Sequence, residues 1–507
     1  MPILSRSRIF PDDPASIATH QPLSILDCHV VRYSPSAAVW IYHDRAPCTV
    51  GQLMMSLRRT LNAYPHFAGQ LHWAIYNPHG DHTQRYQRIT LSYGTPQDPG
   101  VELIVATTSQ TLSSLASSEP IDGCLASNFP TEEFLNATPP LALNNGGDYV
   151  GLPGMVVQIT TLADRNIAVA VKLSHILADA QSLLQFTHDW ASVNRAMSVG
   201  APLPVLSPVF DPPALDRAAA GNIDAPNPDS AILDAARDLP LHRYDLWASE
   251  AGCPSFMIPA TLIPSDLTPE SMGSMGPPLP WANWDFIAPV SRYLVRFSAT
   301  ELQGIWEDAS SVSLVSHLDA LSAHIWRLII RARGFEGVYH LNPSLGFRSR
   351  LDPPLPHAFI GSPLTSAKVA STLDKARSQT LGHLAASIRS SLNTFNASTL
   401  PALLHEMVFE ASPLRLWNAF FGSRNTIVTS WLKLGTLDVD FGAGCAAQVE
   451  AVMPSVDGVI QVMEAAGNHS SKQNSGHWYN GPVTVSLHLR DDVMQKLLKD
   501  SDLRKYQ

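Results

Sequence analysis

Alternating apolar and polar positions in the first two hundred residues predict strands and helices that follow one another along the chain. Residues 155–161 and 166–173 alternate in the way that half-buried strands do. The four residues between them, Leu162 to Arg165, form the expected hairpin turn. Apolar positions then recur at helical spacing from Ala180 to Ala191. The same reasoning predicts three earlier elements: strands at residues 37–42 and 71–75, and a helix at residues 50–61.

The second half of the chain shows the same mixture. Its clearest element is a long helix over residues 316–333, whose apolar stripe consists of Leu318, Leu321, Ile325, Leu328 and Ile329. Strands at residues 292–297, 338–345 and 483–489 and a helix at residues 372–392 complete the pattern. Because strands and helices are mixed in both halves, the pattern predicts two layered α/β (α+β) domains.

A proline-rich stretch separates the two halves. Residues 202–289 contain 16 of the 40 prolines, and proline fixes φ and lacks the amide donor. Regular structure is therefore expected only at residues 230–237. We predict an N-terminal domain over residues 1–201, a crossover over residues 202–289 and a C-terminal domain over residues 290–507. A disordered linker is the alternative, and six large apolar side chains argue against it: Trp247, Phe256, Met257, Ile258, Trp281 and Trp284.

Composition narrows the classes of function. The 507 residues are 45% hydrophobic and 15% charged, a balance typical of globular proteins rather than disordered ones. The net charge of −10 and the lack of a basic run argue against a nucleic-acid partner. No stretch approaches the apolar length of a membrane span, and no secretory signal is visible at the start. We expect a monomeric cytoplasmic enzyme without a membrane partner.

The cysteines support a reducing compartment. They lie far apart and form no CxxC pair, which argues against a zinc site or a disulfide framework. The five positions are Cys28, Cys48, Cys124, Cys253 and Cys445.

An HxxxD spacing occurs twice and provides the first candidate chemistry. His175 closes an apolar strand four residues before Asp179, and an imidazole at a strand end is well placed to reach a cleft. Its ordinary pKa near 6.5 suits proton abstraction at neutral pH. The alternative is a core histidine, with Asp179 capping the helix that follows. The second pair, His488 and Asp492, runs into a charged stretch that we expect to be solvated.

Further segments occur in a fixed order around His175. They are residues 62–71 (NAYPHFAGQL), 316–327 (ending AHIWR), 347–356 (FRSRLDPPLP), 359–362 (FIGS), 429–431 (TSW) and 440–444 (DFGAG). Together with His175 to Ala180, this set resembles the BAHD family of coenzyme-A-dependent acyltransferases. Two positions depart from the family motifs: Ala180 stands where HxxxDG has glycine, and Ala443 where DFGWG has tryptophan. These departures are more typical of a divergent fungal natural-product branch of the family than of a plant enzyme.

The resemblance implies two similar mixed-sheet domains of the chloramphenicol-acetyltransferase-like type with a central channel. It implies that His175 is the general base in this channel. Asp179 is then a structural carboxylate that orients the histidine loop and pairs with an arginine, with Arg348 as the first candidate and Arg350 as the second.

Other site residues follow from the same resemblance. Thr429 and Trp431 are the candidate oxyanion donors, although Trp431 could instead only pack the core. Asp440, Gly442 and Gly444 are expected to be structural, because the glycines permit a tight turn. Ser316 opens the long helix with a capping box and could contact coenzyme A, since helix N-termini attract phosphate. A plain helix cap explains Ser316 equally well.

The implied function is acyl transfer, with acetyl as the expected group, from acyl-CoA to a hydroxyl of a small secondary metabolite. Acyl-CoA is a co-substrate, and we expect no permanently bound cofactor and no metal. No G-x-S-x-G motif offers a nucleophile, so direct transfer in a ternary complex is expected. The alternatives are a related fold recruited as a cyclase or isomerase, or a binding protein without catalysis. An amine acceptor also stays open.

Overall fold

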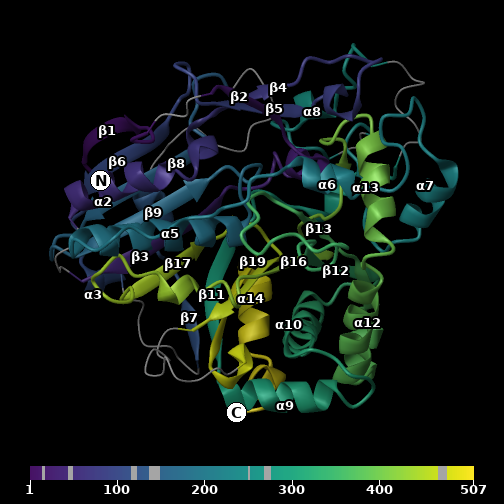
Figure 1. Ribbon diagram of the computed structural model, residues 1–507. Helices are drawn as coiled ribbons and strands as arrows, with labels where there is room; N and C mark the ends of the chain where they lie inside the picture. Colours follow the sequence, from purple (N-terminus) through teal and green to yellow (C-terminus); the bar gives the residue numbers. More distant parts are fainter. Residues whose placement is uncertain are drawn as a thin grey trace.

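Two mixed β-sheets with helices packed against them form the framework of the molecule (Figure 1). The computed structural model describes residues 1–13, 17–43, 49–115, 123–135, 149–248, 252–267, 276–465 and 477–507. Cys48 therefore lies outside the described residues, and the four described cysteines form no disulfide. The two sheets confirm the predicted fold class of two mixed-sheet domains.

The first sheet is built largely from the N-terminal half. Its six strands lie in the order β1 (Ile3–Ile9), β6 (Val101–Thr107), β8 (Met155–Thr161), β9 (Ile167–Leu173), β3 (Ser36–Tyr42) and β17 (Gln448–Val452). Beside it lies a small sheet of β2 (Thr19–Pro22), β5 (Ile89–Tyr93) and β4 (Gln70–Trp73). The helices of this half are α1 (Ile25–His29), α2 (Val50–Leu61), α3 (Leu112–Leu115), α4 (Thr131–Phe134) and α5 (Ala180–Ser198).

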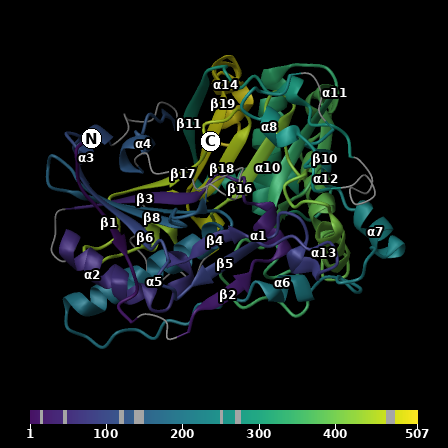
Figure 2. The same cartoon turned by 90° about the horizontal axis from the view of Figure 1, so that it is seen from above.

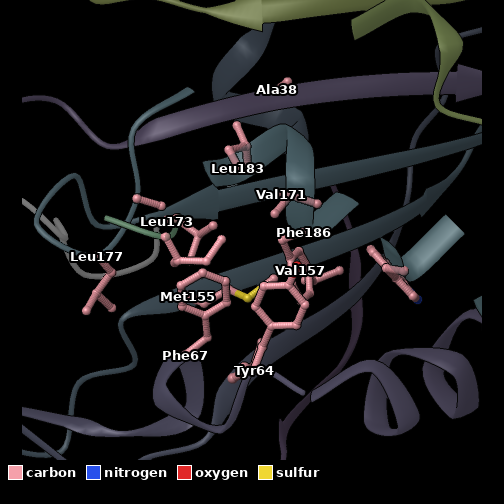
Figure 3. Close-up of a cluster of buried hydrophobic side chains, with 14 of the residues drawn as sticks. Ala38, Tyr64, Phe67, Met155, Val157, Val171, Leu173, Leu177, Leu183 and Phe186 are labelled. Atoms are coloured by element: carbon pink, nitrogen blue, oxygen red, sulfur yellow. The ribbon is translucent and has the colours of Figure 1, made fainter. Parts of the chain in front are cut away.

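Helix α5 and the first sheet enclose the N-terminal core (Figure 3). Val157 and Val171 point from β8 and β9 toward Leu183 and Phe186 of α5. All four side chains are fully buried. This burial explains the alternation seen in the sequence, because the apolar positions of a strand must face the layer that covers them.

The second sheet belongs mainly to the C-terminal half. Its strands lie in the order β13 (Leu364–Ser366), β12 (Val338–Gly346), β16 (Asn425–Ser430), β18 (Val459–Glu464), β19 (Val483–Arg490), β11 (Val290–Phe297) and β7 (Cys124–Ala126). Strand β14 (Val369–Thr372) also pairs with β12. The helices are α9 (Ala299–Ala309), α10 (His317–Arg333), α11 (Leu373–Ser378), α12 (Leu381–Asn393), α13 (Leu400–Phe409) and α14 (Asp491–Leu498).

Each half lends one strand to the other sheet. β7 comes from the N-terminal half and pairs with β11 of the second sheet, with Leu125 opposite Leu294. β17 comes from the C-terminal half and pairs with β3 of the first sheet, with Val449 opposite Trp40. The view from above shows β17 lying beside β3 (Figure 2). The two sheets are therefore tied together at the boundary between the halves.

The proline-rich crossover packs against the C-terminal half. Within it lie α6 (Pro213–Arg217), α7 (Ser230–Arg237), β10 (Tyr244–Asp245) and α8 (Ile258–Thr261), and β10 pairs with β15 (Leu416–Trp417). Trp247, Met257 and Trp281 are buried, whereas Phe256 and Ile258 are largely exposed. The described part of the crossover is thus a packed segment, as its apolar side chains indicate.

One predicted helix is wrong in its extent. The pattern over residues 372–392 is divided into α11 and α12, because Gln379 and Thr380 adopt extended backbone angles. The second helix packs closely on the end of α9, where a Cβ at Gly382 would lie 3.1 Å from the carbonyl oxygen of Ala309. The break between α11 and α12 lets the second helix run in the direction that brings Gly382 to Ala309.

Membrane-spanning helices and clusters of metal-binding side chains are both absent from the described residues. None of their helices is long and apolar enough to cross a membrane. Nor do His, Cys, Asp or Glu side chains gather there in groups of three or more that could hold a metal ion.

Candidate active site

His175 lies in the turn between a buried strand and a long helix. β9 ends at Leu173, and the N–H of Leu177 donates to the carbonyl of Ser174 to close the turn. Asp179 then caps α5, because its carboxylate accepts a hydrogen bond from the N–H of Ser182 at 2.9 Å. The structure places the imidazole at a strand end, as the sequence predicts.

A cavity of about 390 Å³ adjoins His175 at the boundary between the two halves. Tyr33 and Ser34 of the N-terminal half and Thr429 and Trp431 of the C-terminal half share its wall with His175. A wider groove of about 1130 Å³ has Ser34, Pro35 and residues 452–454 in common with the cavity. The two hollows therefore adjoin one another, and both halves of the chain build their walls.

The hydrogen bonds of Ser362 assign the tautomer of His175. The Ser362 hydroxyl donates its one proton to the backbone carbonyl of His175. Its oxygen also lies 3.2 Å from Nδ1 of the imidazole. Because the hydroxyl proton is already engaged, Nδ1 must carry the proton and donate to Ser362. Nε2 is then left with a lone pair and can accept a proton.

The surroundings keep the imidazole neutral. Burial lowers the pKa of His175 below its ordinary value, and the nearby charge of Asp179 only partly opposes this effect. The ring of Tyr33 stands edge-on to the imidazole, with 5.5 Å between ring centroids. A neutral imidazole with a free Nε2 is the form that a general base requires at neutral pH.

Asp179 pairs with Arg348 across the two halves. The two oxygens of the carboxylate lie 2.5 and 3.0 Å from Nη1 and Nη2 of the guanidinium, and both side chains are buried. Burial alone would raise the pKa of Asp179, but the charge and hydrogen bonds of Arg348 lower it overall. Arg350 instead donates to the carbonyls of Leu392 and Phe395. The ion pair therefore fixes the turn that carries His175.

A second carboxylate lies behind Ser362. The N–H of Ser362 donates to Oδ1 of Asp27 at 2.7 Å, and Ser24 donates its hydroxyl to Oδ2 at 2.6 Å. Burial raises the pKa of Asp27 to about 7. Gly361 permits this approach, since its φ is +144° and a Cβ there would lie 3.1 Å from Oδ1 of Asp27. Asp27, Ser362 and His175 thus form a chain of hydrogen bonds.

Thr429 and Trp431 lie at the end of a central strand. Thr429 belongs to β16, which pairs in parallel with β12 and β18, and Trp431 follows the last residue of that strand. Both residues line the cavity together with His175. Trp431 is only 3% exposed and also packs in the N-terminal core. Trp431 therefore packs in the core, as the alternative predicts, and lines the cavity as well.

Ser316 is not brought to this cavity. It caps α10 in a reciprocal box with Asp319, and Arg389 donates to the Ser316 hydroxyl at 2.9 Å. Ser316 does not line either of the two hollows described above. A coenzyme contact at Ser316 stays a prediction that rests on the helix N-terminus, which attracts phosphate.

The DFGAG segment forms a turn, and its residues are not among those that line the cavity. One oxygen of Asp440 accepts hydrogen bonds from the N–H groups of Gly442 and Gly444 at 2.7 and 2.9 Å. Both glycines have positive φ, as a tight turn requires. The neighbouring Phe441 carbonyl accepts from Asn194 of α5 at 2.6 Å. These contacts hold the chain before β17, which fits a structural role.

The second HxxxD pair is divided between a strand and the solvated charged stretch that the sequence predicts after it. His488 is 2% exposed within β19, and burial lowers its pKa to about 3. Its companion Asp492 is exposed and is bound by Arg490 at 2.9 Å. His488 thus lies in the buried strand, and Asp492 lies in the exposed stretch that follows it.

A family model described as "Transferase family" matches residues 1–216 and 291–502. The chain belongs to the BAHD acyltransferases. It is accordingly an enzyme of the acyltransferase class. The internal interval without a match, residues 217–290, falls almost entirely within the proline-rich crossover.

Relatives of this BAHD enzyme include fungal proteins. Acyltransferase AFT15-1 of Alternaria alternata is 27% identical over 92% of this chain and 90% of its own length. Acyltransferase abl6 of Leptosphaeria maculans is 24% identical over 99% and 97%. The crystal structure of F. graminearum TRI101 complexed with ethyl coenzyme A superposes with a TM-score of 0.66 at 16% identity. That superposition covers 97% of this chain and 99% of the other, and it shows a shared fold.

Sequence reasoning missed several residues that the structure places in or beside the candidate site: Asp27, Arg32, Tyr33 and the contacts of Ser362. The Ser24-to-Asp27 spacing is a helix-start signal and could have indicated α1, but nothing local connects it with His175. Tyr33 and Arg32 follow this helix in a loop, where no periodic pattern marks them. Only the tertiary structure brings them to the cavity.

Proposed function

We propose that this enzyme transfers an acyl group from a coenzyme A thioester to a hydroxyl of a small secondary metabolite, with His175 as general base. The observation that carries the proposal is the hydrogen-bond pattern of Ser362, which leaves Nε2 of His175 as the proton acceptor. The position of His175 on the cavity wall supports the same role, because a base must reach its substrate.

The transfer needs one proton to move out and back. Nε2 takes the proton of the acceptor hydroxyl while that oxygen forms a bond to the thioester carbonyl carbon. The carbonyl electron pair moves onto its oxygen and gives a tetrahedral oxyanion. When the carbonyl re-forms, the carbon–sulfur bond breaks and the coenzyme thiolate takes the proton from Nε2. A positioned base of this kind contributes roughly 10²–10⁴-fold to the rate.

The C-terminal half would stabilise the oxyanion. Thr429 and Trp431 carry a hydroxyl and an indole N–H, and both residues line the cavity that His175 also lines. Donors that are already in place where negative charge develops cost no reorganisation during the reaction. Asp179 and Arg348 would act indirectly, by holding the turn that aims His175.

Acetyl is the acyl group that we propose. The cavity of about 390 Å³ has to hold the reacting ends of two substrates, which favours a short acyl chain. The adjoining groove offers a second approach, so the two substrates can meet at His175 in a ternary complex. Direct transfer then needs no covalent acyl-enzyme.

Mass spectrometry of a panel of hydroxylated metabolites incubated with acetyl-CoA tests this proposal. We expect a product that gains one acetyl group, and we expect His175→Ala to form it at least about 10²-fold more slowly with little change in melting temperature. His72→Ala is the matched control, because His72 is exposed on β4 and does not line the cavity. A product formed without any acyl-CoA would indicate a cyclase or isomerase, and full activity in His175→Ala would exclude the general-base role.

A further inference from the structure

Arg32 contributes a charge to the active-site cavity that no carboxylate of the described chain balances. It lines the same cavity as His175 and donates from Nη1 to the carbonyl of Leu414 at 3.2 Å. Its Nε is buried without a hydrogen-bond partner among the described residues. The ion pairs found in the described part of the chain do not include Arg32.

The other groups on the cavity wall do not supply the missing negative charge. Asp179 is already paired with Arg348 by two hydrogen bonds. His29 is neutral, because burial lowers its pKa to about 4, and His175 is neutral for the same reason. The remaining wall residues of the described cavity are uncharged. Arg32 is thus its one unbalanced charge.

An unbalanced cation in a partly buried place is costly unless a ligand completes it. Burial lowers the pKa of Arg32 to about 10, which leaves the guanidinium charged at neutral pH. A guanidinium removed from water requires an anionic partner or several acceptors, and one carbonyl oxygen is less than its five N–H donors need. Its planar fork fits a carboxylate with two parallel hydrogen bonds.

We propose that Arg32 forms a carboxylate-binding subsite, so that one of the two substrates held beside His175 carries a carboxylate. This inference rests on the proposed function, according to which both substrates meet in this cavity. Two sources share the chemistry: an acidic acceptor, which agrees with acetyl transfer, or an acyl group with a free carboxylate such as malonyl, which would replace acetyl as the transferred group.

The phosphates of coenzyme A fit this position less well. Tyr33, the neighbour of Arg32 in the chain, contacts the ring of His175. His175 must reach the thioester carbonyl, and the long pantetheine arm separates this carbonyl from the phosphates. A single guanidinium also offers too little charge for several phosphate groups.

Titration calorimetry with benzoate and benzamide tests the subsite, because the two probes have the same shape and differ in charge. We expect wild type to bind benzoate at least about tenfold more tightly than benzamide. Arg32→Met removes this preference, Arg32→Lys retains part of it, and Arg8→Met leaves it unchanged. Arg8 is the matched control, since it is exposed on β1 and does not line the cavity. Comparing two probes within each variant keeps the result independent of any change in stability.

Titrations with acetyl-CoA and malonyl-CoA distinguish the sources. If Arg32→Met weakens malonyl-CoA but not acetyl-CoA by about tenfold, the carboxylate belongs to the acyl group. The other outcome is that each thioester binds equally well to wild type and to this variant, while wild type still prefers benzoate. The carboxylate that Arg32 binds then belongs to the acceptor. Equal binding of benzoate and benzamide to wild type, including no binding of either, overturns the subsite. So does a preference that survives in Arg32→Met.

The proposed function can fail separately from this subsite. All titrations are repeated in His175→Ala, because ligand binding can be measured in this variant without turnover. A benzoate preference in a protein that acylates nothing would retain the subsite and exclude the function. Acyl transfer by a protein without the preference would do the reverse.

Discussion

The proposed role of His175 as general base depends on a serine to which the sequence alone assigned no role. Ser362 holds both the carbonyl and Nδ1 of His175, and Asp27 in turn holds the backbone of Ser362. An imidazole is a useful base only in the tautomer that leaves the substrate-facing nitrogen unprotonated. In the proposed mechanism Ser362 is therefore a positioning residue, because it would act on the reaction through His175.

Replacing Ser362 by alanine tests this role. Ser362→Ala removes the acceptor for Nδ1–H, so both tautomers become accessible, and we expect kcat to fall by about tenfold or more while KM for acyl-CoA changes little. Nitrogen NMR of the histidine ring should show the mixed tautomers directly. Ser362→Thr is the control, since it keeps the hydroxyl. An unchanged kcat together with a single tautomer in Ser362→Ala would contradict the assignment.

The turn between β9 and α5 is held from two sides. Asp179 caps α5 through the N–H of Ser182 and simultaneously binds Arg348, which follows β12 in the other half. One carboxylate therefore determines where the helix begins and how the two halves meet at His175. The pKa of Asp179 is lowered by this pairing, so the contact persists throughout the neutral range.

Removing this carboxylate should cost stability as well as activity. Asp179→Ala leaves Arg348 buried without a counter-charge, and we expect the free energy of unfolding to fall by about 3–5 kcal/mol. Denaturant titration measures the loss, and turnover should decrease with it. The double variant Asp179→Leu/Arg348→Met should recover much of the stability but not the activity. A stable Asp179→Ala that has lost only catalysis would instead make Asp179 a direct participant.

Local patterns predicted the elements but not all of their partners. β3, β8, β9, α2, α5, α10 and β19 lie where the periodicity places them, because each has one apolar face or a buried run of its own. The exchanged strands β7 and β17 escaped prediction. Their pairing with β11 and β3 joins residues that are far apart in the chain, and this information is absent from any short window. The choice between Arg348 and Arg350 was open for the same reason.

Burial of histidines is a property of the whole molecule. Five described histidines combine low exposure, at most 9%, with a pKa shifted by burial: His29, His66, His242, His324 and His488. Burial lowers the pKa of each to about 3 or 4. The unfolded chain protonates these rings near pH 6.5, whereas the folded chain does not. The unfolded state therefore binds more protons below pH 6.5, and stability falls as the pH falls.

Three carboxyl groups act in the opposite direction. Burial raises the pKa of Asp27 and of Glu410 to about 7 and also raises the pKa of Glu450. Their folded forms bind protons that the unfolded chain releases above pH 4.5, so acidification stabilises the protein at these positions. The histidines outnumber the carboxyls between pH 6.5 and pH 5. Each proton of difference is worth about 1.4 kcal/mol per pH unit, so the net effect is a loss of stability.

His66 offers a way to test this balance with one substitution. Its ring stacks on Phe210 with 4.2 Å between centroids, and its Nε2 is buried without a partner in the described part of the chain. His66→Phe keeps an aromatic ring in an aromatic cluster. It also removes one group that the unfolded chain would protonate. We expect the wild-type melting temperature to fall between pH 6.5 and pH 5, and the fall to be smaller in His66→Phe. We compare the free energy of unfolding of the variant with that of wild type at each pH. This difference should shift in favour of the variant by up to about 2 kcal/mol between pH 7.5 and pH 5. Parallel curves for the two proteins would show that His66 is protonated in the folded state, and a wild type that grows more stable on acidification would show that the buried carboxyls dominate.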